Sequence, residues 1–188
     1  MPIWGIVAMA AAAFLLLIVI ALRNSLIGRR NDVENAFAGI DAQLKKRCDL
    51  IPNLVAAVKT YMAHERGVLD RVTELRARAL AAPAGSNERM EILGELAPAM
   101  RQIVVQAESY PELKASANFQ LLQRSLNEVE EQLSAARRSF NAAVTSYNNA
   151  VEMFPTSIFA AMMGLRRREL FSIPEADREK PDVKQLFS

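Results

Sequence analysis

The chain has 188 residues, with 23 basic and 21 acidic side chains, and its formal charge is only +2. This near balance argues against a dedicated nucleic-acid-binding protein, which would carry a strong basic excess. The single cysteine, Cys48, excludes an internal disulfide, argues against a zinc site of the usual kind and is consistent with a reducing compartment.

An unbroken run of 20 apolar residues, 3–22, comes almost at the start of the chain. As a helix rising about 1.5 Å per residue, it would span roughly 30 Å, the hydrocarbon thickness of a bilayer. A signal peptide would have a shorter apolar core, a positive segment before it and a cleavage site after it. We therefore expect a retained membrane anchor, neither cleaved nor buried in a core. The residues that define this anchor are Ile3, Trp4, Phe14, Leu22 and Arg23.

The charges around the apolar run predict its orientation. Arg23, Arg29 and Arg30 follow the run, and no lysine or arginine precedes it. The positive-inside rule then places the short N-terminus outside and the large C-terminal part in the cytoplasm.

A first helix beyond the anchor is predicted over residues 24–47, and it can continue straight out of the membrane. Its apolar side chains recur at spacings of 4, 3 and 4: Val33, Phe37, Ile40 and Leu44. Pro52 inside a continuous helix would cost about 3 kcal/mol. The sequence therefore favours a turn near residues 47–49, with Asp49 as the N-cap of the next helix, and a kinked continuous helix is the alternative.

Three further helices are predicted, and no β-strand pattern is present. One covers residues 50–82, and the next begins at Ser86, after a loop at 83–86, and ends near 109–111. The fourth has apolar residues in a 3-4 alternation over 36 residues, from Phe119 to Phe154, which resembles a coiled coil and demands partner helices. We expect an all-α fold, in which a single transmembrane helix precedes an antiparallel four-helix bundle with long helices. The predicted parts are a transmembrane anchor (1–23), a helical bundle (24–154) and an apolar and basic segment with an extended tail (155–188).

Several segments resemble the LemA family. The most specific motifs are DLIPNLV at residues 49–55 and ESYPELKA at 108–115, and the similarity extends over residues 31–80, 108–123, 137–151, 154–165 and 181–187. The resemblance implies a bacterial inner-membrane protein with one N-terminal anchor and a helical bundle, without established enzymatic activity. Some relatives in that family are linked to membrane shaping or organelle biogenesis, and others are found alongside envelope-stress proteins.

One pair of polar residues interrupts a predicted apolar seam, and a polar stripe lies beside another. His64 and Glu65 lie on the seam of the second helix, where one of them must point inward. The pair could be a pH-sensitive or ligand-binding node. We favour the alternative, a satisfied polar pair that fixes the register of the helices. A di-iron site would need two Glu-x-x-His motifs, and the single histidine excludes it. On the fourth helix, Arg137, Asn141 and Asn148 form a polar stripe. We expect this stripe to pair across helices with an acidic stripe, Glu34 and Asp41, or to bind a partner.

Residues 157–165 form a short apolar stretch that leads into three arginines. The stretch is too short to span a bilayer, so it can lie in the membrane interface, contact a neighbouring protomer or cap the core of its own bundle. The first two are favoured, and the candidate contact residues are Ile158, Phe159, Met162, Met163, Arg166, Arg167 and Arg168. Residues 172–188 are predicted to be an extended tail.

No nucleophile–base pair, metal cluster or phosphate-binding loop is recognisable in the sequence, so we expect no enzymatic activity, catalytic residue, metal or cofactor. The leading hypothesis is a membrane-anchored helical bundle that self-assembles or scaffolds membrane-protein partners at the cytoplasmic face, with lipids and further copies of itself as partners and no nucleic acid. The alternative is an accessory or regulatory subunit of a membrane protease or an envelope-stress system.

Overall fold

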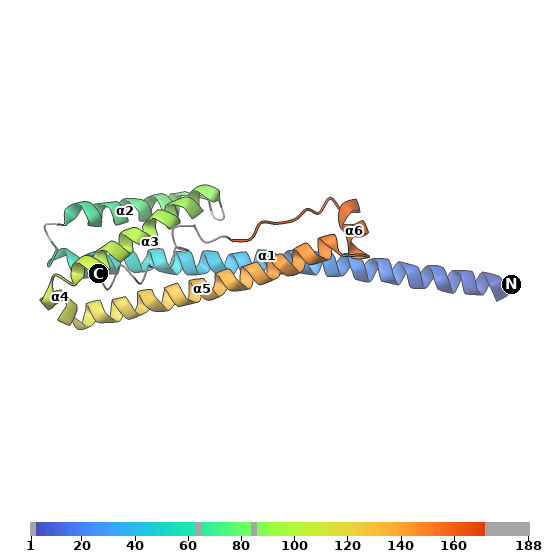
Figure 1. The fold of residues 1–188 in the computed structure, drawn as a ribbon, viewed down its shortest axis with the longest axis horizontal. Helices are drawn as coiled ribbons and strands as arrows, with labels where there is room; N and C mark the ends of the chain where they lie inside the picture. The colour runs from blue at the N-terminus through green and yellow to red at the C-terminus, as the bar shows by residue number, and fades with distance from the viewer. Residues whose placement is uncertain (1–2, 63–64, 84–85, 172–188) are drawn as a thin grey trace, which may run out of the picture. The chain divides into compact units, whose positions relative to one another are not determined.

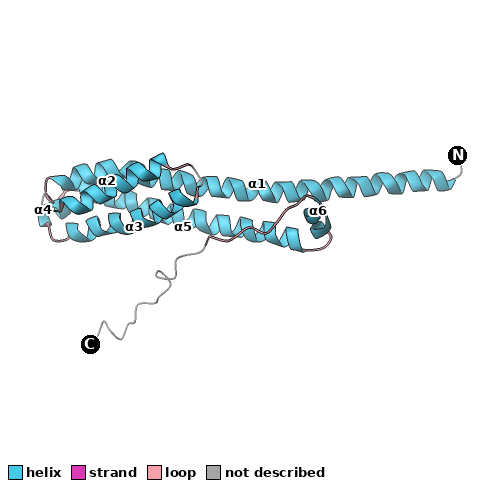
Figure 2. Ribbon diagram, turned by 90° about the horizontal axis from the view of Figure 1, so that it is seen from above, coloured by secondary structure: helices cyan, strands magenta, loops and turns pink. Residues whose placement is uncertain are grey.

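The computed structural model describes residues 3–62, 65–83 and 86–171. All regular structure within these ranges is helical, and no strand occurs in them (Figure 2). This confirms the predicted all-α class. The helices are α1 (Ile3–Lys59), α2 (Arg66–Ala81), α3 (Asn87–Ala107), α4 (Pro111–Ala115), α5 (Ala117–Glu152) and α6 (Thr156–Met162).

The packing divides the chain into two compact units. The anchor unit comprises residues 1–36 and 137–188, and the bundle unit comprises residues 37–136. Helices α1 and α5 contribute to both units. The predicted division into residues 1–23, 24–154 and 155–188 stays a prediction.

Four helical segments build the bundle unit: the second half of α1, α2, α3 and the first half of α5 (Figure 1). Each segment contributes fully or almost fully buried apolar side chains, because its apolar residues recur at helical spacing. Representative core residues are Ile40, Ile51, Leu54 and Val58 of α1, Val72 and Leu75 of α2, Leu96 and Ile103 of α3, and Val129 and Leu133 of α5. Ser86 caps α3 by accepting the Arg89 backbone N–H at 3.1 Å, and the short helix α4 was not predicted.

Helix α1 runs through Pro52 without a break, so the predicted turn at residues 47–49 is wrong and the continuous alternative is right. Pro52 has no N–H and leaves the carbonyl of Cys48, four residues earlier, without its helical donor. Arg76 of α2 replaces that donor, since its Nε–H donates to the Cys48 carbonyl oxygen at 3.0 Å. The predicted helix over residues 50–82 is divided instead between Lys59 and Arg66.

The predicted apolar seams are largely buried, with two exceptions at helix ends. Tyr61 is exposed and Met62 is buried, because Leu54, Val58 and Met62 follow one another in steps of four. Phe154, the predicted last member of the α5 seam, is 82% exposed, since α5 ends at Glu152.

The role of Arg76 can be measured with two substitutions. Arg76→Met keeps the apolar stem but leaves the buried Cys48 carbonyl without a donor, so it should lower the free energy of unfolding by about 1–3 kcal/mol. Pro52→Ala restores the backbone donor, and in that background the cost of Arg76→Met should largely disappear. Circular dichroism during urea unfolding of the detergent-solubilised chain measures both effects.

Arg78→Met is the matched control, because Arg78 is exposed on the same helix and pairs only loosely with Glu74, at 3.9 Å. We expect a change within about 0.5 kcal/mol for this variant. An equal cost of Arg76→Met with and without Pro52 would contradict the explanation.

Candidate functional site

Among the residues that the structure describes, none covers the apolar run of α1. One helix in the described ranges is long and apolar enough to cross a membrane, and it is α1. All side chains from Ile3 to Ala21 are exposed, including Trp4 and Phe14. An uncovered apolar surface of this length needs lipid around it, so the chain is a membrane protein.

Protein packing begins directly after this run. Leu26, four residues beyond Leu22, is fully buried and packs in one cluster with Ala150 of α5 and Ala160 of α6. One helix therefore supplies both the membrane span and the core of the anchor unit. The half-buried residues around that cluster are Val151, Phe159 and Leu165.

Helices α1 and α5 are antiparallel in the anchor unit. Leu26 packs with Ala150, and one turn further from the span Arg29 donates from Nη1 to the Ser146 carbonyl at 3.3 Å and to its hydroxyl. Val33 packs with Val144 and Tyr147 in a second cluster. The C-terminal end of α5 therefore points toward the membrane span.

Helix α6 ends in a glycine-dependent chain reversal. Gly164 has a φ of +66°, a left-handed conformation that a side chain would strain. Its N–H donates to the Ala161 carbonyl at 3.1 Å, and the Leu165 N–H donates to the Ala160 carbonyl at 2.9 Å. These two bonds form a Schellman motif, in which Leu165 makes the accompanying apolar contact. The chain then continues as an irregular stretch, residues 165–171, which we term the return segment.

Two asparagines of α5 bind the backbone of the return segment. Asn148 donates its amide to the Arg168 carbonyl and accepts the Arg168 N–H, both at 2.9 Å. Asn141 makes the same pair of bonds with Phe171, at 3.1 and 2.8 Å. Seven helical residues rise about 10.5 Å and three extended residues span about 10 Å, so the two spacings match. We call this arrangement the asparagine ladder.

Charged and aromatic side chains flank the ladder. Arg168 contacts Glu34 of α1 at 3.2 Å and lies over the Tyr147 ring, 5.6 Å from its centroid. Arg137 lies over the Phe171 ring at 4.9 Å. Hydrogen bonds from Arg30 and Arg168 hold the pKa of Glu34 below its ordinary value. Because the pKa of Glu34 is lower in the folded state, these bonds stabilise the fold at pH values above the ordinary pKa of a glutamate. That stabilisation disappears as the pH falls through the lowered pKa.

Comparison with known proteins identifies the family. The model of the LemA family matches residues 36–185, a range that includes the whole asparagine ladder. The chain belongs to the LemA family.

Relatives of this LemA-family chain are distant in sequence. "Protein LemA" of Metamycoplasma hominis is 23% identical, over 90% of this chain and 77% of the relative. Magnetosome protein MamQ 2 of Paramagnetospirillum magneticum is 22% identical and magnetosome protein MamQ of Magnetospirillum gryphiswaldense 21% identical, each over 87% of this chain and 70% of the relative.

The polar stripe predicted on the fourth helix is present, but its partner differs from the expected one. The amides of Asn141 and Asn148 bind the chain's own return segment and not an acidic stripe. Glu34 pairs with Arg30 and Arg168, whereas Asp41 pairs with Arg89 of α3 at 3.3 Å. Asparagine spacing of seven was the signal available in the sequence, and it did not reveal which backbone the amides would bind.

The other predicted site residues of this LemA-family chain do not form one site. Glu65 accepts a hydrogen bond from Gln106 Nε2 of α3 at 3.3 Å, while His64 and residues 172–188 lie outside the described residues. Phe159 and Arg168 face the helices of their own unit, and Arg167 pairs with Glu152 at 3.1 Å. The exposed members of the predicted contact segment are Ile158, Met162, Met163, Arg166 and Arg167.

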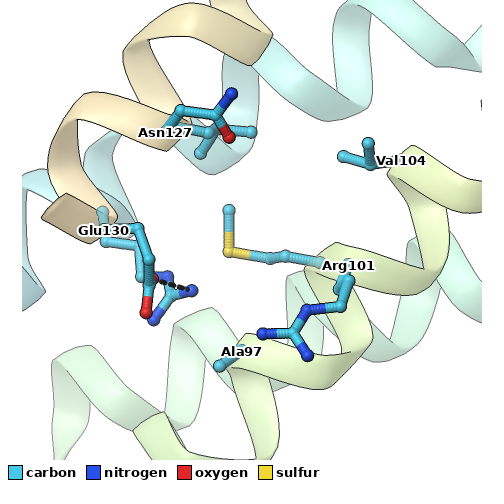
Figure 3. Close-up of a pocket in the computed structure, with 8 residues that line it drawn as sticks. Ala97, Arg101, Val104, Asn127 and Glu130 are labelled. Atoms are coloured by element: carbon cyan, nitrogen blue, oxygen red, sulfur yellow. Dashed lines mark ion pairs between the residues drawn. The ribbon is translucent and has the colours of Figure 1, made fainter. Parts of the chain in front are cut away.

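The bundle unit has an open hollow of about 200 Å³ beside the Arg47–Glu130 ion pair (Figure 3). Its rim is formed by α1, α3 and α5, and Arg101 and Asn127 also line it. A second hollow of about 590 Å³ lies between α1 and α2, with Met62, Leu69 and Asp70 among its lining residues. Pockets for small molecules usually enclose about 300–1,000 Å³, whereas both of these hollows are open to solvent. We therefore take the membrane-proximal end of the anchor unit as the candidate functional site.

The asparagine ladder predicts how the return segment responds to protease. Asn148→Ala removes both bonds to Arg168 and should favour release of the segment by about 1–2 kcal/mol, which corresponds to a roughly 5- to 30-fold faster tryptic cleavage after residues 166–168. Asn149→Ala, at the exposed neighbouring position, is the control and should cleave at the original rate. Equal cleavage rates for the two variants would show that the ladder does not hold the segment.

Proposed function

We propose that this chain is a non-enzymatic, membrane-anchored helical scaffold that self-assembles, or holds membrane-protein partners, at the cytoplasmic face of the bacterial inner membrane. The observation that carries the proposal is the position of Leu26, fully buried only four residues beyond the apolar span. At about 1.5 Å per residue, the folded core begins roughly 6 Å from the end of the span, with no linker between them.

This arrangement suits a scaffold because it confines folded surfaces to the plane of the membrane. Copies that move in one plane meet more often than copies in free solution, so modest contacts are enough to hold an assembly together. The bundle unit offers exposed apolar side chains for such contacts, among them Val105 of α3 and Leu121 of α5.

The chemistry of the candidate site also favours a structural role. Its asparagines are used to bind backbone, and its arginines Arg167 and Arg168 are paired with carboxylates. Two relatives are magnetosome proteins by name, and on that analogy we propose that the assembly serves membrane organisation.

Self-assembly predicts crosslinks between copies in native membranes. A photo-crosslinking residue at Val105 or Leu121, in cells that carry two differently tagged copies, should give covalent pairs containing both tags. Mass spectrometry of the products identifies the partner. A stoichiometric link to a different membrane protein would instead favour an accessory subunit of a protease or stress system. A strictly monomeric extracted protein without links would contradict the scaffold.

The proposed orientation predicts that the C-terminus is cytoplasmic. A phosphatase that is active only outside the cytoplasm, fused after Ser188, should remain inactive, because the arginines after the span hold this side in the cytoplasm. A fluorescent protein that matures only in the cytoplasm, fused at the same position, should be bright. The reverse pattern would overturn the orientation.

A further inference from the structure

Beyond the membrane span, exposed apolar side chains gather directly after α5 and on α6, which lies beside α1 (Figure 1). Met153 and Phe154 are 62% and 82% exposed, and Ile158 and Met162 are 54% and 78% exposed. We call these four residues the apolar face. Because no described part of the chain covers these four side chains, the surface they form needs a partner.

The opposite side of α6 holds this face in position. Phe159 and Ala160 pack in the cluster that contains Leu26 of α1, and Leu165 closes it after the turn at Gly164. Ile158 and Met162, four residues apart, lie on the other side of the helix, one turn from each other. The short helix is thus amphipathic, with one side fastened to α1 and the other exposed.

The antiparallel register gives the depth of the apolar face. Leu26 lies about 6 Å beyond Leu22, the end of the apolar run, and the headgroup layer on each side of a bilayer is about 5–8 Å thick. The residues packed around Leu26 are therefore at headgroup depth. Helix α5 continues past Ala150 to Glu152, about 3 Å nearer the span, and Met153 and Phe154 follow directly after it.

The charge around the apolar face matches an anionic lipid surface. Residues 22–36 and 150–168 carry six arginines against three carboxylates. Arg23 and Arg166 are exposed, while Arg167 is paired with Glu152. Exposed basic side chains next to an inserted apolar face are the usual composition of an interfacial helix.

We propose that the apolar face is a second membrane contact, inserted into the headgroup–acyl boundary of the leaflet from which α1 emerges. The occupant is an anionic phospholipid bilayer, since the face is continuous with the transmembrane span and lies at the depth where lipid surrounds the chain. The contact rests on one part of the proposed function, the membrane anchor, and is independent of self-assembly. It prevents the anchor unit from tilting freely about α1, because the unit then touches the membrane at two places.

Spin labels on the full chain in nanodiscs of phosphatidylcholine and phosphatidylglycerol test this contact. In a Cys48→Ala background, single labels are placed with Met162→Cys and Phe154→Cys on the apolar face and with Arg78→Cys, at an exposed polar position of α2, as the control. Accessibility to oxygen, which concentrates in lipid, is compared with accessibility to a water-soluble nickel complex. We expect the oxygen-to-nickel ratio at positions 162 and 154 to exceed that at position 78 several-fold, and circular dichroism verifies the fold of each variant.

Three outcomes would overturn the contact. A ratio at position 162 equal to that at position 78 would place the face in water. Protection from both reagents, with spin–spin broadening that disappears on dilution with unlabelled chain, would assign the face to a second copy. Protection from both reagents without broadening would mean that another part of this chain or a different protein covers the face. A label at Phe14→Cys separates the two proposals, because lipid exposure there without lipid exposure at position 162 leaves the anchor intact and removes only the second contact.

Discussion

A backbone N–H or C=O that leaves a helix and is shielded from water must find another partner, and this constraint governs the irregular parts of the molecule. At Pro52 the partner of the freed carbonyl is a guanidinium from α2. At the end of α6, the freed carbonyls of Ala160 and Ala161 accept the N–H groups of the Schellman turn around Gly164. Along the return segment, the partners are the amides of the asparagine ladder. In each place a polar group of specific geometry allows the chain to depart from a simple helix without exposing its core.

The asparagine side chain suits the ladder because it has one donor and one acceptor on the same planar group. It can therefore bind both the N–H and the C=O of a single residue, as a neighbouring β-strand would. Two such residues one helical heptad apart hold a stretch of extended chain against α5 without any strand present in the described part of the protein. The return segment in turn brings Arg168 to Glu34 and covers Tyr147, so it closes the side of the α1–α5 pair.

The membrane imposes the second constraint. A single helix supplies the span and the first buried residue of the folded part, so the distance of the core from the lipid depends only on helical rise. Helix α5 is antiparallel to α1 and ends close to the span, and the short helix α6 with its exposed apolar side follows it. The geometry of α1 and α5 thus places α6 where we propose that it meets the bilayer surface. The proposed self-assembly in the plane and the proposed second lipid contact use different surfaces, namely the bundle unit and α6, and are compatible with each other.

Length and periodicity in the sequence determined the membrane span, the helical class, the α5 seam and most of the core, because these depend on spacing along one helix. The continuation of α1 through Pro52 was decided only by the tertiary structure, since the donor that makes it tolerable, Arg76, lies on another helix. The same holds for the ladder: the spacing of Asn141 and Asn148 marked a polar stripe, but an amide pairs equally well with a side chain or with backbone. What the sequence could not specify is which distant segment would approach, because that depends on where the chain reverses after α6 and on the register of α1 against α5.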